Sequence, residues 1–231
     1  MALLRLRKPP NIFQLDNHTG PDRYPALFQF AREHFERRMK LRLLSFGCST
    51  GEEVSALRHY FPEAAIVGID INPHNIAICR SRVGPDSNTT FVVAGTTGGE
   101  DVDSYDAIFC LSVLRHGGLR AAGTERCDHL IRFDDFERTV ADFTRCLKPG
   151  GLLFIANANF RLCDTAFANR FEVLLLEDHH APDPRAPIFG RDNRRIKDIY
   201  YNELGFQKLG RCGLHHPEPN AGLKEGDRRG S

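Results

Sequence analysis

The chain has 231 residues, of which 41% are apolar and 26% charged, and its formal net charge is +1. This length accommodates one α/β domain with a sizeable core. A net charge so close to zero gives no electrostatic basis for nucleic acid as the main partner. No apolar run approaches the length of a membrane span, and the apolar start of the chain is too short for a signal peptide.

Seven cysteines are scattered singly along the chain, without a C-x-x-C pair. Metal sites usually need clustered ligands, so we expect no metal site, and the dispersed set suits a reducing compartment. Cys79 and Cys110 lie in apolar runs and are expected to be buried thiols. Together with the missing signal peptide, these features predict a cytoplasmic protein.

Short apolar runs alternate with helical patterns through the first two thirds of the chain. Strands that alternate with helices imply βαβ units, so we expect an α/β fold with a doubly wound, mostly parallel sheet. In chain order, the predicted elements are strand Leu41–Phe46, helix Glu52–Tyr60, strand Ala65–Asp70, helix Asn75–Arg82, strands Thr90–Ala94 and Ala107–Leu111, helix Phe133–Cys146 and strand Leu152–Ala156.

The later part of the chain breaks this alternation. Phe171–Leu176 is a candidate added strand, and Pro187–Gly190 reads as a strand that enters a tight turn at Arg191–Asn193. Ile196–Glu203 has a helical pattern, and Gly205–Leu209 is expected to be the last strand.

We therefore predict one domain over residues 1–212, with a helical lid segment at 1–40. Residues 162–196 are interpreted as an insertion that covers the ligand side of the sheet and carries substrate recognition. Within the domain, Lys148–Gly151 is expected to end a helix and turn the chain. The tail at 213–231 is polar and rich in glycine and proline, so disorder is expected there.

The loop Gly47–Gly51 leaves the first strand, at the place where open α/β sheets bind ligands. It lacks the G-x-G-x-x-G pattern of dinucleotide sites, and Glu52 and Glu53 follow at once, which would repel a pyrophosphate. An acidic pair suits a ligand with an ammonium and a sulfonium group, such as S-adenosylmethionine. The alternative is that the two acids only stabilise the start of a helix.

Asp70 ends the second predicted strand. A carboxylate at this position can accept hydrogen bonds from both ribose hydroxyls, as it does in other nucleoside-binding folds of this type. The alternative is that Asp70 only caps the turn that begins at Asn72 and Pro73.

Four segments, in this order and spacing, resemble the class I S-adenosylmethionine-dependent methyltransferases: Leu43–Gly51, Gly68–Ile71, Tyr105–Phe109 and Leu147–Gly151. The resemblance covers about half of the chain. It implies a seven-stranded Rossmann-like methyltransferase fold, with S-adenosylmethionine as cofactor and S-adenosylhomocysteine as product. By this resemblance, Gly47, Ser49 and Gly51 line the methionine part, Asp70 holds the ribose and Ile71 packs on the adenine.

A closer resemblance joins Phe46–Glu53 to the loop A-C-S-T-G-E-E of the chemotaxis receptor glutamate methyltransferases. Asn17–Arg23 and Phe109–Leu114 resemble two further motifs of that family. The resemblance implies additional contacts with the cofactor or the reacting group from Thr19, Arg23, Glu52 and Ser112. The complete set of predicted cofactor-binding residues is Thr19, Arg23, Gly47, Cys48, Ser49, Gly51, Glu52, Asp70, Ile71, Leu111 and Ser112.

The sequence also departs from those families. The connection from Asp70 to Phe91 is too short for the small β-subdomain of the chemotaxis enzymes, and we expect their N-terminal helical domain to be missing. Ser45 stands where many class I enzymes end the first strand in an acid, and Thr96 where many carry an acid after the third strand. These departures favour a small molecule over a chemoreceptor as the acceptor.

Methyl transfer from a sulfonium is an in-line displacement, so positioning supplies much of the rate. A hydroxyl acceptor also benefits from a general base. His116, after the fourth strand, is the first candidate, and His18, in the N-terminal segment, is the second; an ordinary loop histidine is the alternative. If the acceptor is a carboxylate, no base is needed and Arg23 could bind it bidentately.

Three functions stay open at this point. The first is an enzyme that O-methylates a small molecule, such as a sugar or a biosynthetic intermediate. The second is a protein carboxyl methyltransferase of the chemotaxis type, and the third is a cofactor-binding protein without turnover. We expect a small-molecule acceptor, and no nucleic acid or membrane as partner.

Overall fold

The computed structural model describes residues 13–14, 20, 23–83, 88–120, 123–176, 187–199 and 201–210. The candidates His18 and Thr19 lie outside these ranges, and so does the predicted disordered tail at 213–231. None of the helices in the described ranges has the length and apolar character that a membrane crossing needs.

A seven-stranded sheet forms the centre of the molecule, with the strand order β3-β2-β1-β4-β5-β7-β6. The first five strands pair in parallel, β7 runs antiparallel to β5, and β6 runs antiparallel to β7. The predicted doubly wound, mostly parallel α/β fold is therefore confirmed. The strands are β1 (Arg42–Phe46), β2 (Ala65–Asp70), β3 (Thr89–Val93), β4 (Tyr105–Leu111), β5 (Leu147–Ala156), β6 (Phe171–Leu176) and β7 (Glu203–Lys208).

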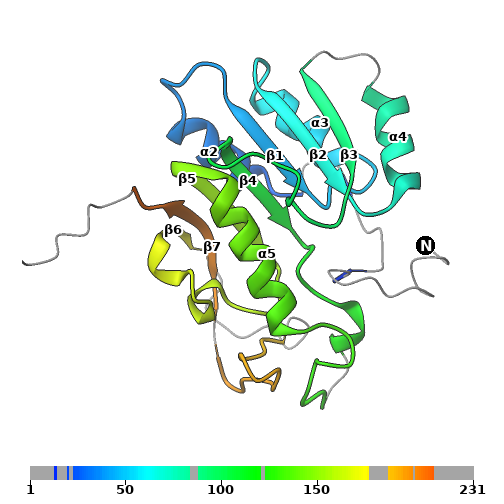
Figure 1. The fold of residues 1–231 in the computed structure, drawn as a ribbon, viewed down its shortest axis with the longest axis vertical. Coiled ribbons are helices and arrows are strands. Elements are labelled where there is room, and N and C mark those ends of the chain that lie inside the picture. The colour runs from blue at the N-terminus through cyan, green and yellow to red at the C-terminus, as the bar shows by residue number, and fades with distance from the viewer. Residues whose placement is uncertain are drawn as a thin grey trace, which may run out of the picture.

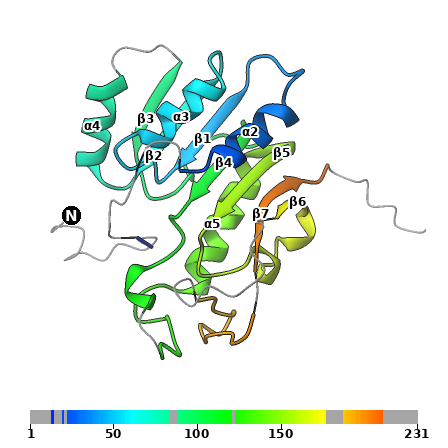
Figure 2. The same ribbon diagram turned by 180° about the vertical axis from the view of Figure 1, so that it is seen from behind.

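Helices cover both faces of the sheet. Figure 1 shows α5 (Phe133–Cys146) across one face, and Figure 2 shows the other face, where α2 (Pro25–His34), α3 (Glu52–Tyr60) and α4 (Pro73–Val83) lie. The fully buried neighbours Leu43 and Leu44 of β1 point into opposite core clusters. This explains why β1 reads as a continuous apolar run, since both sides of a parallel strand are covered.

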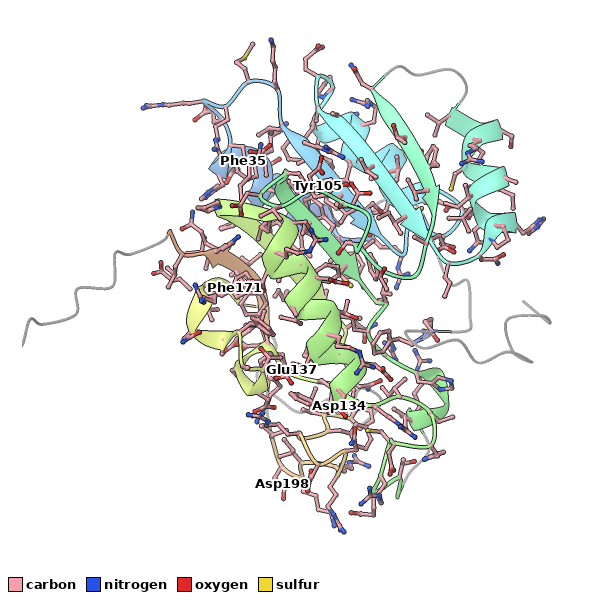
Figure 3. All side chains as sticks on the ribbon, viewed as in Figure 1. Phe35, Tyr105, Asp134, Glu137, Phe171 and Asp198 are labelled. Carbon is pink, nitrogen blue, oxygen red and sulfur yellow. The ribbon has the colours of Figure 1, made fainter. Side chains whose placement is uncertain are left out.

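Helix α5 has the bounds that the apolar spacing predicts. Its buried side chains repeat every three or four residues and pack on the sheet. Asp134 lies in the first turn, where a negative charge is favourable, and Glu137 follows one turn later (Figure 3). The carboxylate of Glu137 accepts a hydrogen bond from the Ala166 amide at 2.8 Å, which ties α5 to the segment before β6.

The helix predicted at Ile196–Glu203 is wrong. The Ile196 amide donates to the Ile188 carbonyl at 2.9 Å, which joins the start of this segment to the residues before the turn. Asp198 has a left-handed backbone (φ +53°), which a helix does not allow, and Glu203 already begins β7. The described residues of this segment therefore form no helix, although their apolar spacing resembles that of a helix.

The turn expected at Lys148–Gly151 lies inside β5. This strand begins at Leu147, which pairs with Tyr105, and an irregularity in the register follows before Leu152 pairs with Ala107. Gly150 provides the left-handed backbone that this irregularity needs (φ +73°).

An extension beyond the carboxyl ends of β4 and β5 is formed by residues 113–120, 123–132 and 187–199 (Figure 1). The predicted turn at Arg191–Asn193 is confirmed, because the Asn193 amide donates a hydrogen bond to the Gly190 carbonyl at 2.9 Å. The Asn193 side chain then accepts from the Phe133 amide at 2.7 Å, and Phe189 is fully buried in the core on the α5 face. Of the predicted insertion at residues 162–196, one part forms strand β6 of the sheet and the last part belongs to this extension.

We predict that Phe109→Ala destabilises the protein by about 3–5 kcal/mol, because it removes a fully buried ring from the sheet. Phe109 stacks on Phe154 with ring centroids 4.8 Å apart. Urea denaturation measures the loss. Met39→Ala, at an 87% exposed position, is the control and should change stability by less than about 0.5 kcal/mol. Equal effects of the two substitutions would contradict this packing.

Candidate functional site

The strand order reverses between β1 and β4, and the residues singled out by sequence gather at the carboxyl ends of these strands and of β2. The loop Gly47–Gly51 follows β1, Asp70 ends β2, and Ser112 follows β4. The Ser49 amide donates to Asp70 Oδ2 at 2.9 Å, so the predicted cofactor loop and the predicted ribose acid are in direct contact.

The loop owes its shape to three left-handed residues, Gly47 (φ +74°), Ser49 (φ +50°) and Gly51 (φ +95°). A Cβ atom at Gly47 would lie 2.5 Å from a methyl group of Val113, so only glycine fits there. The amides of Gly47 and Cys48 both donate to the Ile69 carbonyl, at 2.7 and 3.0 Å. The loop is therefore held against the end of β2 before any ligand binds.

Asp70 is almost completely buried, with 8% of its surface exposed. Burial raises the pKa of this carboxyl, and hydrogen bonds from Asn72, Ser49 and Asn75 act in the opposite direction. The Asn72 amide donates a 2.8 Å hydrogen bond to the Asp70 carboxylate. This is the turn cap considered from the sequence, so Asp70 does cap the turn. A carboxylate has about four acceptor positions, so three bonds leave capacity for a ribose hydroxyl.

The Ser49 hydroxyl oxygen is buried and has no hydrogen-bond partner within the described part of the chain. Buried hydroxyls are rarely left in this state, and one that is calls for an explanation. It stands in the loop, on the residue whose amide binds Asp70. A polar ligand held by this loop would supply the missing partner, so the site fits the expected cofactor here.

The two neighbouring acids of α3 have different surroundings. Glu52 accepts hydrogen bonds from Thr50 and forms an ion pair with Arg82 on α4. Burial raises the pKa of Glu52, but the bonds from Thr50 and Arg82 outweigh it and hold that pKa below its usual range. Glu52, a predicted cofactor contact, is thus paired with the loop and with α4.

Glu53 occupies the strand ends instead. Its carboxylate accepts a 2.7 Å hydrogen bond from the Ser45 hydroxyl, and Arg23 is near enough to stabilise its charge. Burial raises the pKa of Glu53 to about 8 despite these two partners. In the class I enzymes that the sequence resembles, an acid often stands at the position of Ser45. Here Glu53 brings a carboxylate to Ser45 from the next helix. A serine near the end of β1, where an acid is often found, is the sign in the sequence that another residue supplies the carboxylate.

Ser112 is the centre of a second polar cluster. Its hydroxyl lies 2.6 Å from the Tyr24 hydroxyl, 2.8 Å from Asn157 Nδ2 and 3.4 Å from Arg23 Nη2. Ser112 (φ +62°) and Asn157 (φ +55°) both have a left-handed backbone at the ends of neighbouring strands, a conformation that often marks functional sites. The predicted residues Arg23 and Ser112 therefore meet, while Tyr24 and Asn157 were not expected from the sequence.

Other predicted residues lie around these clusters. Ile71 packs where a Cβ atom of Gly95 would stand, with Cδ1 2.9 Å from that position, and it lines the side where the adenine is expected. Leu111 is 6% exposed and belongs to the core. Cys48 is also buried, and its side chain contacts Cys79, so it packs beneath the loop. Cys110 is fully buried, as expected.

His116 follows β4, as predicted, and its Nδ1 accepts a 3.0 Å hydrogen bond from the Gly118 amide. This bond places the proton of the neutral ring on Nε2, which is then a donor. The general base expected from the sequence would require the opposite arrangement. The His116 amide is held by the buried Asn159 side chain at 2.8 Å, so the loop is well fixed.

Comparison with known proteins agrees with this geometry. Residues 44–153 match a family model for a methyltransferase domain. This part of the chain is therefore similar to methyltransferase domains. The match agrees with the expected methyltransferase class, and it does not reach the N-terminal segment or the strands β6 and β7.

Individual relatives are more distant. The chain is 32% identical over 59 residues to an uncharacterized phycocyanin operon protein W of Pseudanabaena tenuis, which covers 26% of this chain and 56% of that protein. The YcgJ protein of Bacillus subtilis is 18% identical, with a TM-score of 0.42 over 57% of this chain and 50% of that one. A Haemonchus contortus phosphoethanolamine N-methyltransferase, solved with S-adenosylhomocysteine, is 19% identical, with a TM-score of 0.44 over 61% and 29%.

We predict that the stability of the ligand-free protein falls as the pH rises from about 5 to about 8. The folded pKa of Glu53, about 8, lies above its ordinary value, so the folded state holds the proton more tightly throughout this window. Glu53→Gln should remove this dependence, which amounts to at most about 1.4 kcal/mol per pH unit. Urea denaturation across the window measures it; parallel curves for the two proteins would contradict the burial of Glu53.

Proposed function

We propose that the whole chain is an S-adenosylmethionine-dependent methyltransferase that methylates an oxygen atom of a small molecule. The single observation that carries the proposal is the contact between the loop and Asp70, beside the buried Ser49 hydroxyl, which has no partner among the residues that the structure describes. The chain spans only about half of the length of the relatives that it matches, so their activities are not transferred here.

The nucleoside part of the cofactor would lie at the end of β2. Asp70 has acceptor capacity for a ribose hydroxyl, and the Ser49 hydroxyl gains a partner when the ribose or the methionine part binds. Ile71 and Gly95 offer an apolar surface for the adenine. With Thr96 in place of an acid, adenine recognition rests on backbone groups and apolar packing.

The methionine part would lie between Glu53 and Arg23. An amino acid carries an ammonium group and a carboxylate, and this pair offers one opposite charge to each. The ammonium also removes the cost of ionising Glu53 in its buried place, so cofactor binding and the loss of the Glu53 proton are coupled. This explains why an acid with a raised pKa is useful at this position.

Bound at this site, the cofactor supplies a methyl group on a positively charged sulfur. The chain's own contribution is positioning: the rigid loop after β1 fixes the donor, and the cluster around Ser112 fixes the acceptor beyond it. The network from Tyr24 to Asn157 links the N-terminal segment to the ends of β4 and β5.

A small molecule is the favoured acceptor because the connection between β2 and β3 comprises only residues 71–88, and α4 is the only element in its described part. A receptor-binding subdomain has no room there. The resemblance of Phe46–Glu53 to the chemotaxis enzymes stays a prediction, and protein carboxyl methylation stays the alternative. Both of these functions require transfer of a labelled methyl group to an acceptor, whereas a cofactor-binding protein without turnover would transfer none.

We predict that S-adenosylhomocysteine raises the melting temperature of the protein, because a ligand of the native state stabilises it by about 2.7 kcal/mol at 100 times its Kd. Asp70→Ala should abolish the shift, since the ribose loses its acceptor. Asp128→Ala, at an exposed ion pair with Arg126, is the matched control and should keep the shift. No shift of the unaltered protein at millimolar ligand would contradict the proposal, and a full shift with Asp70→Ala would show that the ribose lies elsewhere.

A further inference from the structure

The direction of each hydrogen bond around Ser112 can be worked out from the groups involved. The guanidinium of Arg115 bonds to Asn157 Oδ1, and a guanidinium can only donate, so the oxygen of this amide must face Arg115. The amide nitrogen of Asn157 therefore faces Ser112 and donates to its hydroxyl oxygen at 2.8 Å. Arg115 is 5% exposed and thus fixes the orientation of Asn157 from a buried position.

The hydrogen of the Ser112 hydroxyl then has one possible acceptor among the three partners of that hydroxyl. Asn157 Nδ2 and the Arg23 guanidinium both donate to it. Only the Tyr24 oxygen, at 2.6 Å, can accept. Ser112 is therefore the donor in its bond with Tyr24, and the phenolic hydrogen of Tyr24 is directed to another group.

The other polar side chains at these strand ends have no acceptor or have one already in use. His116 uses its acceptor nitrogen on the Gly118 amide. Asn159 uses its oxygen on the His116 amide and its nitrogen on the Pro187 carbonyl. Arg23 can only donate. Glu53 is the exception, and it is the partner assigned to the ammonium group of the cofactor.

We propose that Tyr24 is the specificity residue for the acceptor and that it donates its phenolic hydrogen to the oxygen of a small-molecule carboxylate. This inference rests on the proposed function. A site rich in donors suits an acceptor that already carries negative charge, whereas a neutral hydroxyl would need a base to take its proton. The bond that Tyr24 accepts from Ser112 strengthens the bond that it donates.

The reaction balances without a base. One carboxylate oxygen forms a bond to the methyl carbon while the bond from that carbon to sulfur breaks and its electron pair stays on sulfur. The carboxylate becomes a methyl ester, the sulfonium becomes a neutral thioether, and no proton is transferred. The second carboxylate oxygen keeps the hydrogen bond from Tyr24.

The test compares acetate with acetamide, its neutral isostere, as probes of the acceptor site in protein saturated with S-adenosylhomocysteine. We expect acetate at about 50 mM to raise the melting temperature of the complex by about 2 °C beyond chloride at equal ionic strength, and acetamide to give no such shift. Tyr24→Phe should lose the acetate shift and keep the shift caused by S-adenosylhomocysteine itself. Tyr60→Phe, which removes a phenol from the end of α3, is the matched control and should keep both.

Each outcome decides the matter. An acetate shift no larger than that of acetamide or chloride overturns the proposal, and so does an acetate shift that persists in Tyr24→Phe. If the unaltered protein fails to respond to S-adenosylhomocysteine, the proposed function fails instead, before acetate is added. If the acetate shift is lost only in Tyr24→Phe, the carboxylate acceptor and the role of Tyr24 are supported together.

Discussion

The hydrogen bond from the Ser49 amide to Asp70 is the constraint on which the rest of the site depends. It joins the ends of two neighbouring parallel strands, and it holds Ser49 in a left-handed conformation that a serine rarely adopts. With the loop so fixed, Glu53 in the first turn of α3 reaches back over Ser45. A ligand that binds Asp70 therefore also meets the loop and the buried carboxyl.

The two ends of the site differ in charge. Glu53 supplies a carboxylate beside β1, whereas the groups around Ser112 are hydrogen-bond donors beside β4 and β5. A cofactor with an ammonium group suits the first end, and an acceptor with negative charge suits the second. The order of the strands brings both ends to one edge of the sheet, so the site needs no second domain.

Much of the parallel half could be predicted from the sequence because its strands are buried on both faces and end in marked residues, such as Asp70. The helix pattern at Ile196–Glu203 failed because the Ile196 amide bonds to Ile188 and Asp198 has a left-handed backbone, which local periodicity does not reveal. Glu52 was chosen over Glu53 although neighbouring helix residues point about 100° apart, and only the fold shows which one faces the strands. Tyr24 was missed because its partner Ser112 is distant in sequence.

The central claim is that the carboxyl ends of β1, β2 and β4 form the cofactor site. Hydrogen–deuterium exchange with and without S-adenosylhomocysteine tests it most directly, because it locates binding along the chain without choosing an acceptor. Our account expects slower exchange in residues 47–53, 70–75 and 111–116, with the amino ends of the strands unchanged. Binding with slower exchange elsewhere and none in these three segments would contradict it.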